Sequence, residues 1–141
     1  MSIRIHYDEI NYRLKRSGKI KKFLEKVILA ENKVPGDLNF VFTNDEKLLG
    51  ININFLGHDY YTDVISFVDS SDVLVGGEVY ISIDTVNRNA LTYGVSRYEE
   101  VLRVMIHGTL HLCGYKDGTE GERDMMTERQ EMNLKEFRRV D

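Results

Sequence analysis

The chain has 141 residues, of which 42% are apolar and 30% charged, and this composition predicts an ordinary globular domain that spans residues 1–141. A net charge of −4 excludes the overall positive field that many nucleic-acid-binding proteins carry. The sequence has no apolar run near the ~20 residues that span a bilayer, no apolar signal core in MSIRIHYDEI and only one cysteine, so we expect a cytoplasmic protein without disulfides or membrane contact.

Strand and helix patterns alternate along the first half of the chain. Strands are predicted where apolar and polar side chains alternate or β-formers gather, and helices where apolar residues recur at three- and four-residue spacing. The predicted elements are a strand at 3–7, a helix after Ser17 and Gly18 with its apolar face from Ile20 to Ile28, a turn at Pro35-Gly36-Asp37, a strand at 38–43, and a short helix capped by Thr43 or Asn44 and running through Ile53.

The second half carries two strand patterns and then three helix patterns. The predicted elements are a strand at 64–68, a loop at 70–72, a strand at 76–83, a helix capped by Asp84 and ending near Gly94, a helix from Ser96 to Gly114, and a last helix from Thr119. Ser96 with Glu99, and Thr119 with Glu122, match the capping box, in which two side chains bond each other's backbone N–H groups. This order of elements predicts an α/β or α+β fold in which a sheet of about four strands is covered by helices.

Basic residues cluster between positions 13 and 26. The cluster consists of Arg13, Lys15, Arg16, Lys19, Lys21, Lys22 and Lys26, with Glu25 among them. A solvated helix face explains such a cluster, and so does a local contact with a phosphate backbone, which salt would weaken. The sequence leaves both interpretations open.

His107 and His111 stand four residues apart on the predicted helix 96–114. Four residues turn an α-helix through about 400°, so both imidazoles leave one face about 6 Å apart, which suits two nitrogens on one metal ion. Gly114 can reverse the chain and bring Asp117 back as a third ligand. Three protein ligands with an open position are typical of a catalytic zinc site. Histidine pairs at this spacing also occur without a metal, and Gly114 and Asp117 are what favour a site here.

The pattern H-x3-H-x2-G-x2-D has the spacing of the zincin signature H-E-x-x-H-x-x-G-x-x-H, with Gly108 in place of the glutamate. That glutamate is the general base of metallopeptidases, so Gly108 argues against peptide hydrolysis by the usual route. A metal could still polarise a phosphoryl oxygen or lower the pKa of a bound water. Asp63 and Glu78 are candidates for a base supplied from elsewhere in the chain.

Residues 107–115, HGTLHLCGY, with Asp117 after them, resemble the H-G-x-L-H-L-x-G-Y-D-H motif of the YbeY family of bacterial endoribonucleases. Upstream, TDVISF at 62–67 is similar to the family's T-D-V-L-S-F strand, and Gly77-Glu78 is similar to its G-D. The order and spacing agree over nearly the whole chain. The resemblance therefore implies a single YbeY-like domain with an α+β fold, a small mixed four-stranded sheet and a zincin-like metal helix.

The resemblance also implies a function and a cofactor. It implies one Zn²⁺, or another divalent metal, held by His107, His111 and Asp117. It implies a metal-dependent, single-strand-specific endoribonuclease that acts in 16S rRNA 3′-end maturation and ribosome quality control. Single-stranded RNA, rRNA and the small ribosomal subunit with its proteins are the partners that come with this role.

Two positions depart from the family pattern. Asp117 stands where the family has its third histidine; a carboxylate can still bind zinc, but it lowers the net charge of the site and favours harder cations. Leu56 stands where the family commonly has an arginine that could hold phosphate, and leucine cannot do so. His58 is the nearby side chain that could donate to phosphate instead.

The remaining candidate site residues lie between positions 58 and 66. They are Asp63 for catalysis, and His58, Thr62 and Ser66 for substrate binding. Tyr60 and Tyr61 could stack on bases or pack on the sheet.

Two rival functions remain. One is a ribosome-associated RNA-binding factor with a mainly structural metal, and the other is a zincin-like hydrolase that acts on another substrate, such as a peptide. Cys113 is expected to be a buried thiol that points away from the histidines, rather than a fourth ligand.

Overall fold

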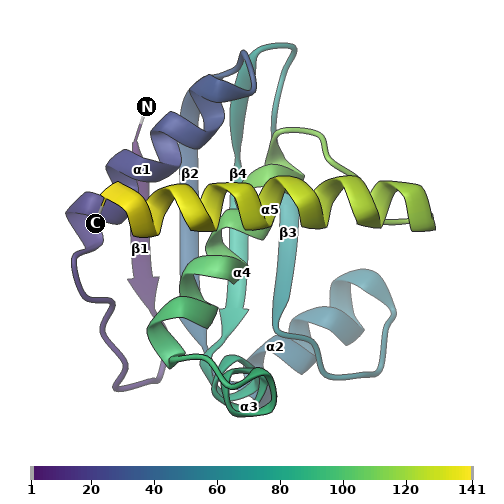
Figure 1. Ribbon diagram of the computed structural model, residues 1–141. Coiled ribbons are helices and arrows are strands. Elements are labelled where there is room, and N and C mark those ends of the chain that lie inside the picture. The colour runs from purple at the N-terminus through teal and green to yellow at the C-terminus, as the bar shows by residue number, and fades with distance from the viewer. Residues whose placement is uncertain (1, 141) are drawn as a thin grey trace.

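A mixed sheet of four strands, in the order β1-β2-β4-β3, forms the centre of the fold (Figure 1). The computed structural model describes residues 2–140. β2 is parallel to both β1 and β4, whereas the edge strand β3 is antiparallel to β4. The strands are β1 (Ile3–Tyr7), β2 (Val34–Thr43), β3 (Val64–Val68) and β4 (Leu74–Ser82). The predicted α+β class with a small mixed sheet is confirmed.

Helix α4 lies against the sheet, and the long helix α5 crosses in front of it (Figure 1). The helices are α1 (Ser17–Ala30), α2 (Asp45–Ile51), the π-helix η1 (Asn52–Leu56), α3 (Ile83–Tyr93), α4 (Arg97–Leu112) and α5 (Glu120–Val140). Within residues 2–140, none of these helices combines the length and the apolar character that crossing a membrane requires.

The core lies between the sheet and the helices α1 and α4. Every second side chain of β2 points into it, and Leu38, Phe40 and Phe42 are fully buried there, as the alternating pattern of a strand predicts. The apolar face of α1 from Ile20 to Ile28 packs on the same core. The opposite face of α1 exposes basic side chains of the cluster at 13–26, so both interpretations of that cluster remain open.

Two sequence predictions are wrong, and both fail because of distant partners. Pro35-Gly36-Asp37 does not form a free turn but belongs to β2, where the pairing with β4 shifts register. Asp84 does not cap α3: the Oγ of Ser82 accepts the N–H of Thr85 at 3.4 Å and takes that place. Asp84 instead accepts the N–H of Asp45 at 3.0 Å, at the start of α2.

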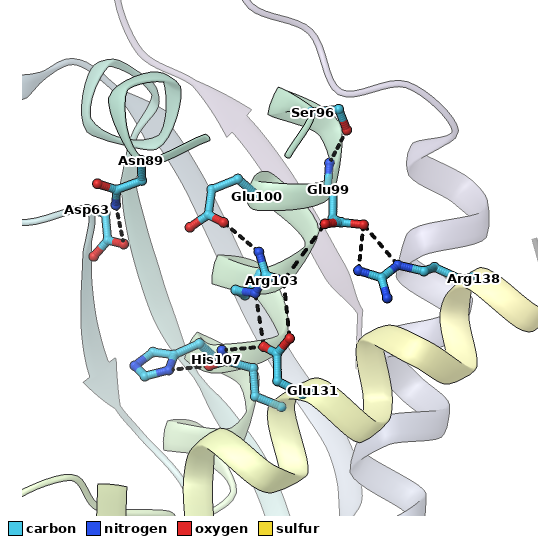
Figure 2. Close-up of polar contacts among 10 residues, drawn as sticks. Asp63, Asn89, Ser96, Glu99, Glu100, Arg103, His107, Glu131 and Arg138 are labelled. Atoms are coloured by element: carbon cyan, nitrogen blue, oxygen red, sulfur yellow. Dashed lines mark hydrogen bonds and ion pairs between the residues drawn. The ribbon is translucent and has the colours of Figure 1, made fainter. Parts of the chain in front are cut away.

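The capping interactions predicted for the starts of α4 and α5 are present, one of them in full and one in part. Thr119 and Glu122 form both hydrogen bonds of a capping box, at 3.0 and 3.1 Å. Ser96 caps α4 by accepting the N–H of Glu99 at 3.1 Å, but the Glu99 carboxylate pairs with Arg138 of α5 instead of completing the box. Glu99 thus connects α4 to α5 through its ion pair with Arg138 (Figure 2).

Candidate metal centre

The last turns of α4 and the loop that follows bring three potential metal ligands together. One ligand atom from each of His107, His111 and Asp117 lies within 4.8 Å of the others. The two imidazole rings have centroids 4.7 Å apart, and Oδ2 of Asp117 lies 3.3 Å from Nε2 of His111. Gly114, with φ 111°, lies between α4 and Asp117 in the segment that reverses the chain.

In both histidines a hydrogen-bond acceptor lies next to Nδ1. This is the nitrogen that would stay free if a metal were bound through Nε2. Nδ1 of His107 lies 2.7 Å from Oε1 of Gln130, and Nδ1 of His111 lies 3.1 Å from the carbonyl oxygen of Tyr115. Each imidazole can therefore donate from Nδ1 and present the lone pair of Nε2. Metal-binding histidines are held in this way, so the residues fit a metal ion.

A chain of hydrogen bonds fixes the orientation of the Gln130 amide. Its Nε2 donates to Glu131 at 3.0 Å, and Arg103 holds the Glu131 carboxylate with two bonds of 2.9 and 3.1 Å. Arg103 also donates to Glu100 at 2.7 Å (Figure 2). Because the amide nitrogen faces Glu131, the amide oxygen faces His107.

Burial and pairing with opposite charges shift the pKa values of the ionisable groups in this network. Glu100 is only 2% exposed, and burial raises the pKa of its carboxyl although Arg103 opposes the shift. The hydrogen bonds that Arg103 donates to Glu131 lower the pKa of the Glu131 carboxyl and raise the pKa of the Arg103 guanidinium. The guanidinium therefore stays charged between two acids, and it links α4 to α5 about one helical turn before His107.

Burial also acts on the second histidine. It lowers the pKa of His111, the proximity of His107 adds to this effect, and Asp117 opposes it. His111 is thus held toward its neutral form, which is the form that binds a metal.

A cavity of about 430 Å³ opens beside the three ligands. His58, Thr62, Asp63 and Ser66 all line it, as do η1 residues and β3. Among the described residues 2–140, no lysine or arginine lines this cavity. The structure thus brings these four residues and the three ligand candidates to one cavity, whereas their roles remain predictions.

The candidate site residues differ in how they are held. Oδ2 of Asp63 accepts a hydrogen bond from Asn89 of α3 at 3.3 Å (Figure 2), and the hydroxyl of Thr62 donates to the carbonyl oxygen of Val64 at 3.3 Å. Oγ of Ser66 is buried without a hydrogen-bond partner among residues 2–140. Glu78 is exposed on β4, accepts from the hydroxyl of Tyr80 and does not line the cavity, so Asp63 is the better placed of the two candidate bases.

Gly108 faces the sheet instead of the cavity. A Cβ atom at this position would lie 2.6 Å from Cγ1 of Val79 on β4. The glycine therefore allows α4 to pack closely on the sheet. A glutamate at this position would collide with β4, so the base of the zincin signature has no room here.

Cys113 is not one of the three grouped ligands. Burial raises the pKa of its thiol to about 12, and the side chain lines a different cavity, together with Tyr115. The expectation of a thiol directed away from the histidines agrees with this position.

No pattern in the sequence indicates Gln130, Arg103 or Glu131 as part of the site. Gln130 lies 23 residues after His107 and on another helix, and no local spacing connects the two. Only the crossing of α5 over α4 brings them together.

The fold and the ligand group together define a class: small α+β proteins with a candidate metal site at the end of a helix that packs on a mixed sheet. The sequence model of the family described as Endoribonuclease YbeY matches residues 3–138. The chain belongs to the YbeY family, as the motif at 107–115 predicts.

Relatives and a solved structure agree with this assignment. The Endoribonuclease YbeY of Christiangramia forsetii is 40% identical over 93% of this chain and 92% of its own length. The one from Flavobacterium psychrophilum is 42% identical over 92% of each chain. A Thermotoga maritima protein solved in solution has a similar fold, with a TM-score of 0.65 and 29% identity over 96% of this chain and 88% of its own.

Proposed function

We propose that this chain is a metal-dependent endoribonuclease that cuts single-stranded RNA in 16S rRNA 3′-end maturation and ribosome quality control. The small ribosomal subunit and its proteins are its proposed partners. Membership of a family whose relatives are named endoribonucleases supports RNA as the substrate. The observation that carries the metal dependence is the approach of His107, His111 and Asp117 ligand atoms to within 4.8 Å of one another.

Each ligand has a defined part in this proposal. His107 and His111 would hold Zn²⁺, or another divalent ion, through Nε2, and Asp117 would hold it through a carboxylate oxygen. Such an ion supplies positive charge to a phosphoryl oxygen and acidity to a bound water. The Asp117 carboxylate lowers the net charge of the site relative to a third imidazole, which favours harder cations.

Protein groups would supply the rest of the chemistry. Asp63 can accept a proton because its carboxylate lines the same cavity as the ligands, and the hydrogen bond from Asn89 orients it. His58 and Thr62 offer polar contacts to the substrate from the cavity wall. Ser66 also lines the cavity and is a third candidate for substrate contact.

The test is cleavage of a short single-stranded RNA by zinc-loaded protein, beside the His107→Ala variant and a chelated sample. We expect cleavage by the wild type alone, because both controls lack the metal. Zinc content measured on His111→Ala gives a separate readout, and we expect it to fall well below one ion per chain. Equal cleavage in all three samples would mean that the activity does not come from this site.

One observation favours a second function, a ribosome-associated RNA-binding factor whose metal is mainly structural. The cavity has no cationic side chain among the described residues, and Leu56 lines it. If the protein is such a binding factor, the wild type should bind RNA and zinc but should not cleave the RNA. A peptidase is disfavoured, because the position of its usual glutamate is Gly108, which faces Val79.

A further inference from the structure

The segment after η1 presents two aromatic rings to the cavity. The rings of His58 and Tyr60 are stacked, with centroids 5.2 Å apart and planes 15° from parallel. A hydrogen bond of 3.0 Å joins the Tyr60 hydroxyl to Nδ1 of His58. Tyr60 is 56% exposed, and both residues line the cavity that contains the three metal-ligand candidates.

A buried asparagine holds this ring pair in place. Asn52 is 2% exposed; its side chain donates to the carbonyl oxygen of Tyr60 at 2.9 Å, and its own carbonyl accepts the N–H of His58 at 3.1 Å. Gly57, with φ 69°, turns the chain between η1 and the rings. π-Helical turns such as η1 are frequent at functional sites. The rings are thus ordered before any ligand binds, so little ordering entropy opposes binding to them.

The charges of the cavity wall exclude the usual way of holding a nucleic acid. No lysine or arginine lines the cavity within residues 2–140, and the acids Asp63 and Asp117 do. Lysine and arginine side chains of residues 2–140 therefore do not hold the phosphates of an RNA inside this cavity. The ring pair and Leu56 offer flat and apolar surfaces instead, and these match the face of a nucleobase.

We propose that His58 and Tyr60 form a nucleobase-stacking subsite of the cavity. One unstacked base of a single-stranded RNA lies on the ring pair while a neighbouring phosphate reaches His107, His111 and Asp117. This inference rests on the proposed function and adds a way to select single strands. A base within a duplex is already stacked between its neighbours and cannot enter, whereas a single strand can turn a base outward.

The absence of tryptophan from the chain allows a direct test. Tyr60→Trp keeps an aromatic ring and adds the only tryptophan, whose emission changes when a base stacks on it. We expect a short single-stranded RNA to quench this emission, and the same sequence as a duplex, or an abasic oligonucleotide of equal charge, to leave it nearly unchanged. Gel analysis after the titration checks that the RNA is intact.

A matched control lies outside the cavity. Tyr93 ends α3, is 64% exposed and does not line the cavity, so Tyr93→Trp should show no quenching by the same RNA. Equal quenching of both variants, or equal quenching by the abasic strand, would overturn the proposal.

Affinity gives a second readout. Tyr60→Leu should weaken binding of the single-stranded RNA by about 5- to 150-fold, the range found for loss of one base–aromatic stack. Tyr60→Phe should keep most of the affinity, because it keeps the ring. Unchanged binding by Tyr60→Leu would refute the subsite.

The two proposals can fail separately. Metal-dependent cleavage by the wild type, together with unquenched Tyr60→Trp, would leave the endoribonuclease standing and refute the subsite. Base-specific quenching without any cleavage would support the subsite and refute the catalytic role.

Discussion

Gln130 lies outside the group of candidate ligands, and its side chain contacts one of them, His107. It touches Nδ1 of His107 at 2.7 Å, and Glu131 holds its amide from the other side. Hydrogen-bond partners of this kind orient the imidazole and make it a better ligand. Gln130 lies 23 positions from His107 along the chain, and only the fold places its amide oxygen against this candidate ligand.

Replacing Gln130 should therefore weaken metal binding. We expect Gln130→Leu to lower zinc affinity by about 10- to 100-fold, because Nδ1 of His107 loses its acceptor. Competition with a chromogenic chelator measures this affinity. Met132→Leu, on an exposed position of the same helix, should leave it unchanged. Equal zinc affinity of the Gln130→Leu variant and the wild type would show that the hydrogen bond does not orient the ligand.

Gly108 gives a second prediction at the scale of one residue. In Gly108→Ala the new Cβ would lie 2.6 Å from Cγ1 of Val79. Overpacking of a core costs about 1–3 kcal/mol, more than the ~0.5–1 kcal/mol that alanine gains over glycine in a helix. We expect the free energy of unfolding, measured in urea, to fall.

The matched control is Gly50→Ala, because a Cβ at Gly50 meets nothing within 4 Å and the residue also lies in a helix. Its free energy of unfolding should rise slightly, by up to about 1 kcal/mol. If both alanine variants gained stability, the close approach of α4 to β4 would not be what requires a glycine.

At the scale of elements, Asp45 joins the start of α2 to the start of α3. Its carboxylate accepts hydrogen bonds from Ser82 and Thr85 at 2.6 Å each, and from Arg88 at 2.7 Å. Burial raises the pKa of Asp45, but these three bonds together outweigh it and lower the pKa below the ordinary 3.8. The ionised carboxylate is therefore the form that the folded state prefers.

This preference has a definite sign with pH. A group with a lowered folded-state pKa stabilises the fold above its unfolded pKa, and the contribution disappears as pH falls through the folded value. Asp45→Asn should thus lower the free energy of unfolding by about 1–3 kcal/mol at pH 7, and by progressively less below about pH 3.8. Urea titrations at several pH values measure the difference.

Asp72→Asn, at an exposed position, serves as the control and should show almost no effect at any pH. A loss of stability in Asp45→Asn that stays constant down to pH 2 would mean that the shape of the side chain matters here, and its charge does not.

For the whole molecule, the three candidate metal ligands lie on the last turns of α4 and in the loop that leads into α5, so a bound ion would tie these two segments together. A ligand that binds only the folded state stabilises it, by about 2.7 kcal/mol when its free concentration is 100 times its Kd. We expect the Tm of the wild type to rise with added zinc and to fall with a chelator. Differential scanning fluorimetry checks this without any assay of activity.

His111→Ala provides the comparison, because it removes one of the three ligands and its Tm should respond little to zinc. A response as large as that of the wild type would place the bound zinc elsewhere on the chain. The same comparison at several protein concentrations would show whether the shift comes from association of chains.

Local sequence alone predicted the three candidate metal ligands. His107 and His111 share one face because an α-helix repeats every 3.6 residues, and Gly114 allows the chain to return with Asp117 within a few positions. The strands and helices were predictable for a related reason: their apolar patterns have the period of the element that forms. These features depend on neighbours along the chain, so a sequence can reveal them.

Only the tertiary structure decided which distant residues meet. Asp84 accepts the N–H of Asp45 in the first turn of α2 instead of capping its own helix, Pro35 lies in a paired strand, and Gln130 reaches His107 because α5 crosses α4. The same packing brings Asp63 and the ring pair of His58 and Tyr60 into one cavity with the ligands. Such contacts follow from how whole elements bury their apolar faces together, and no local spacing in the sequence contains that information.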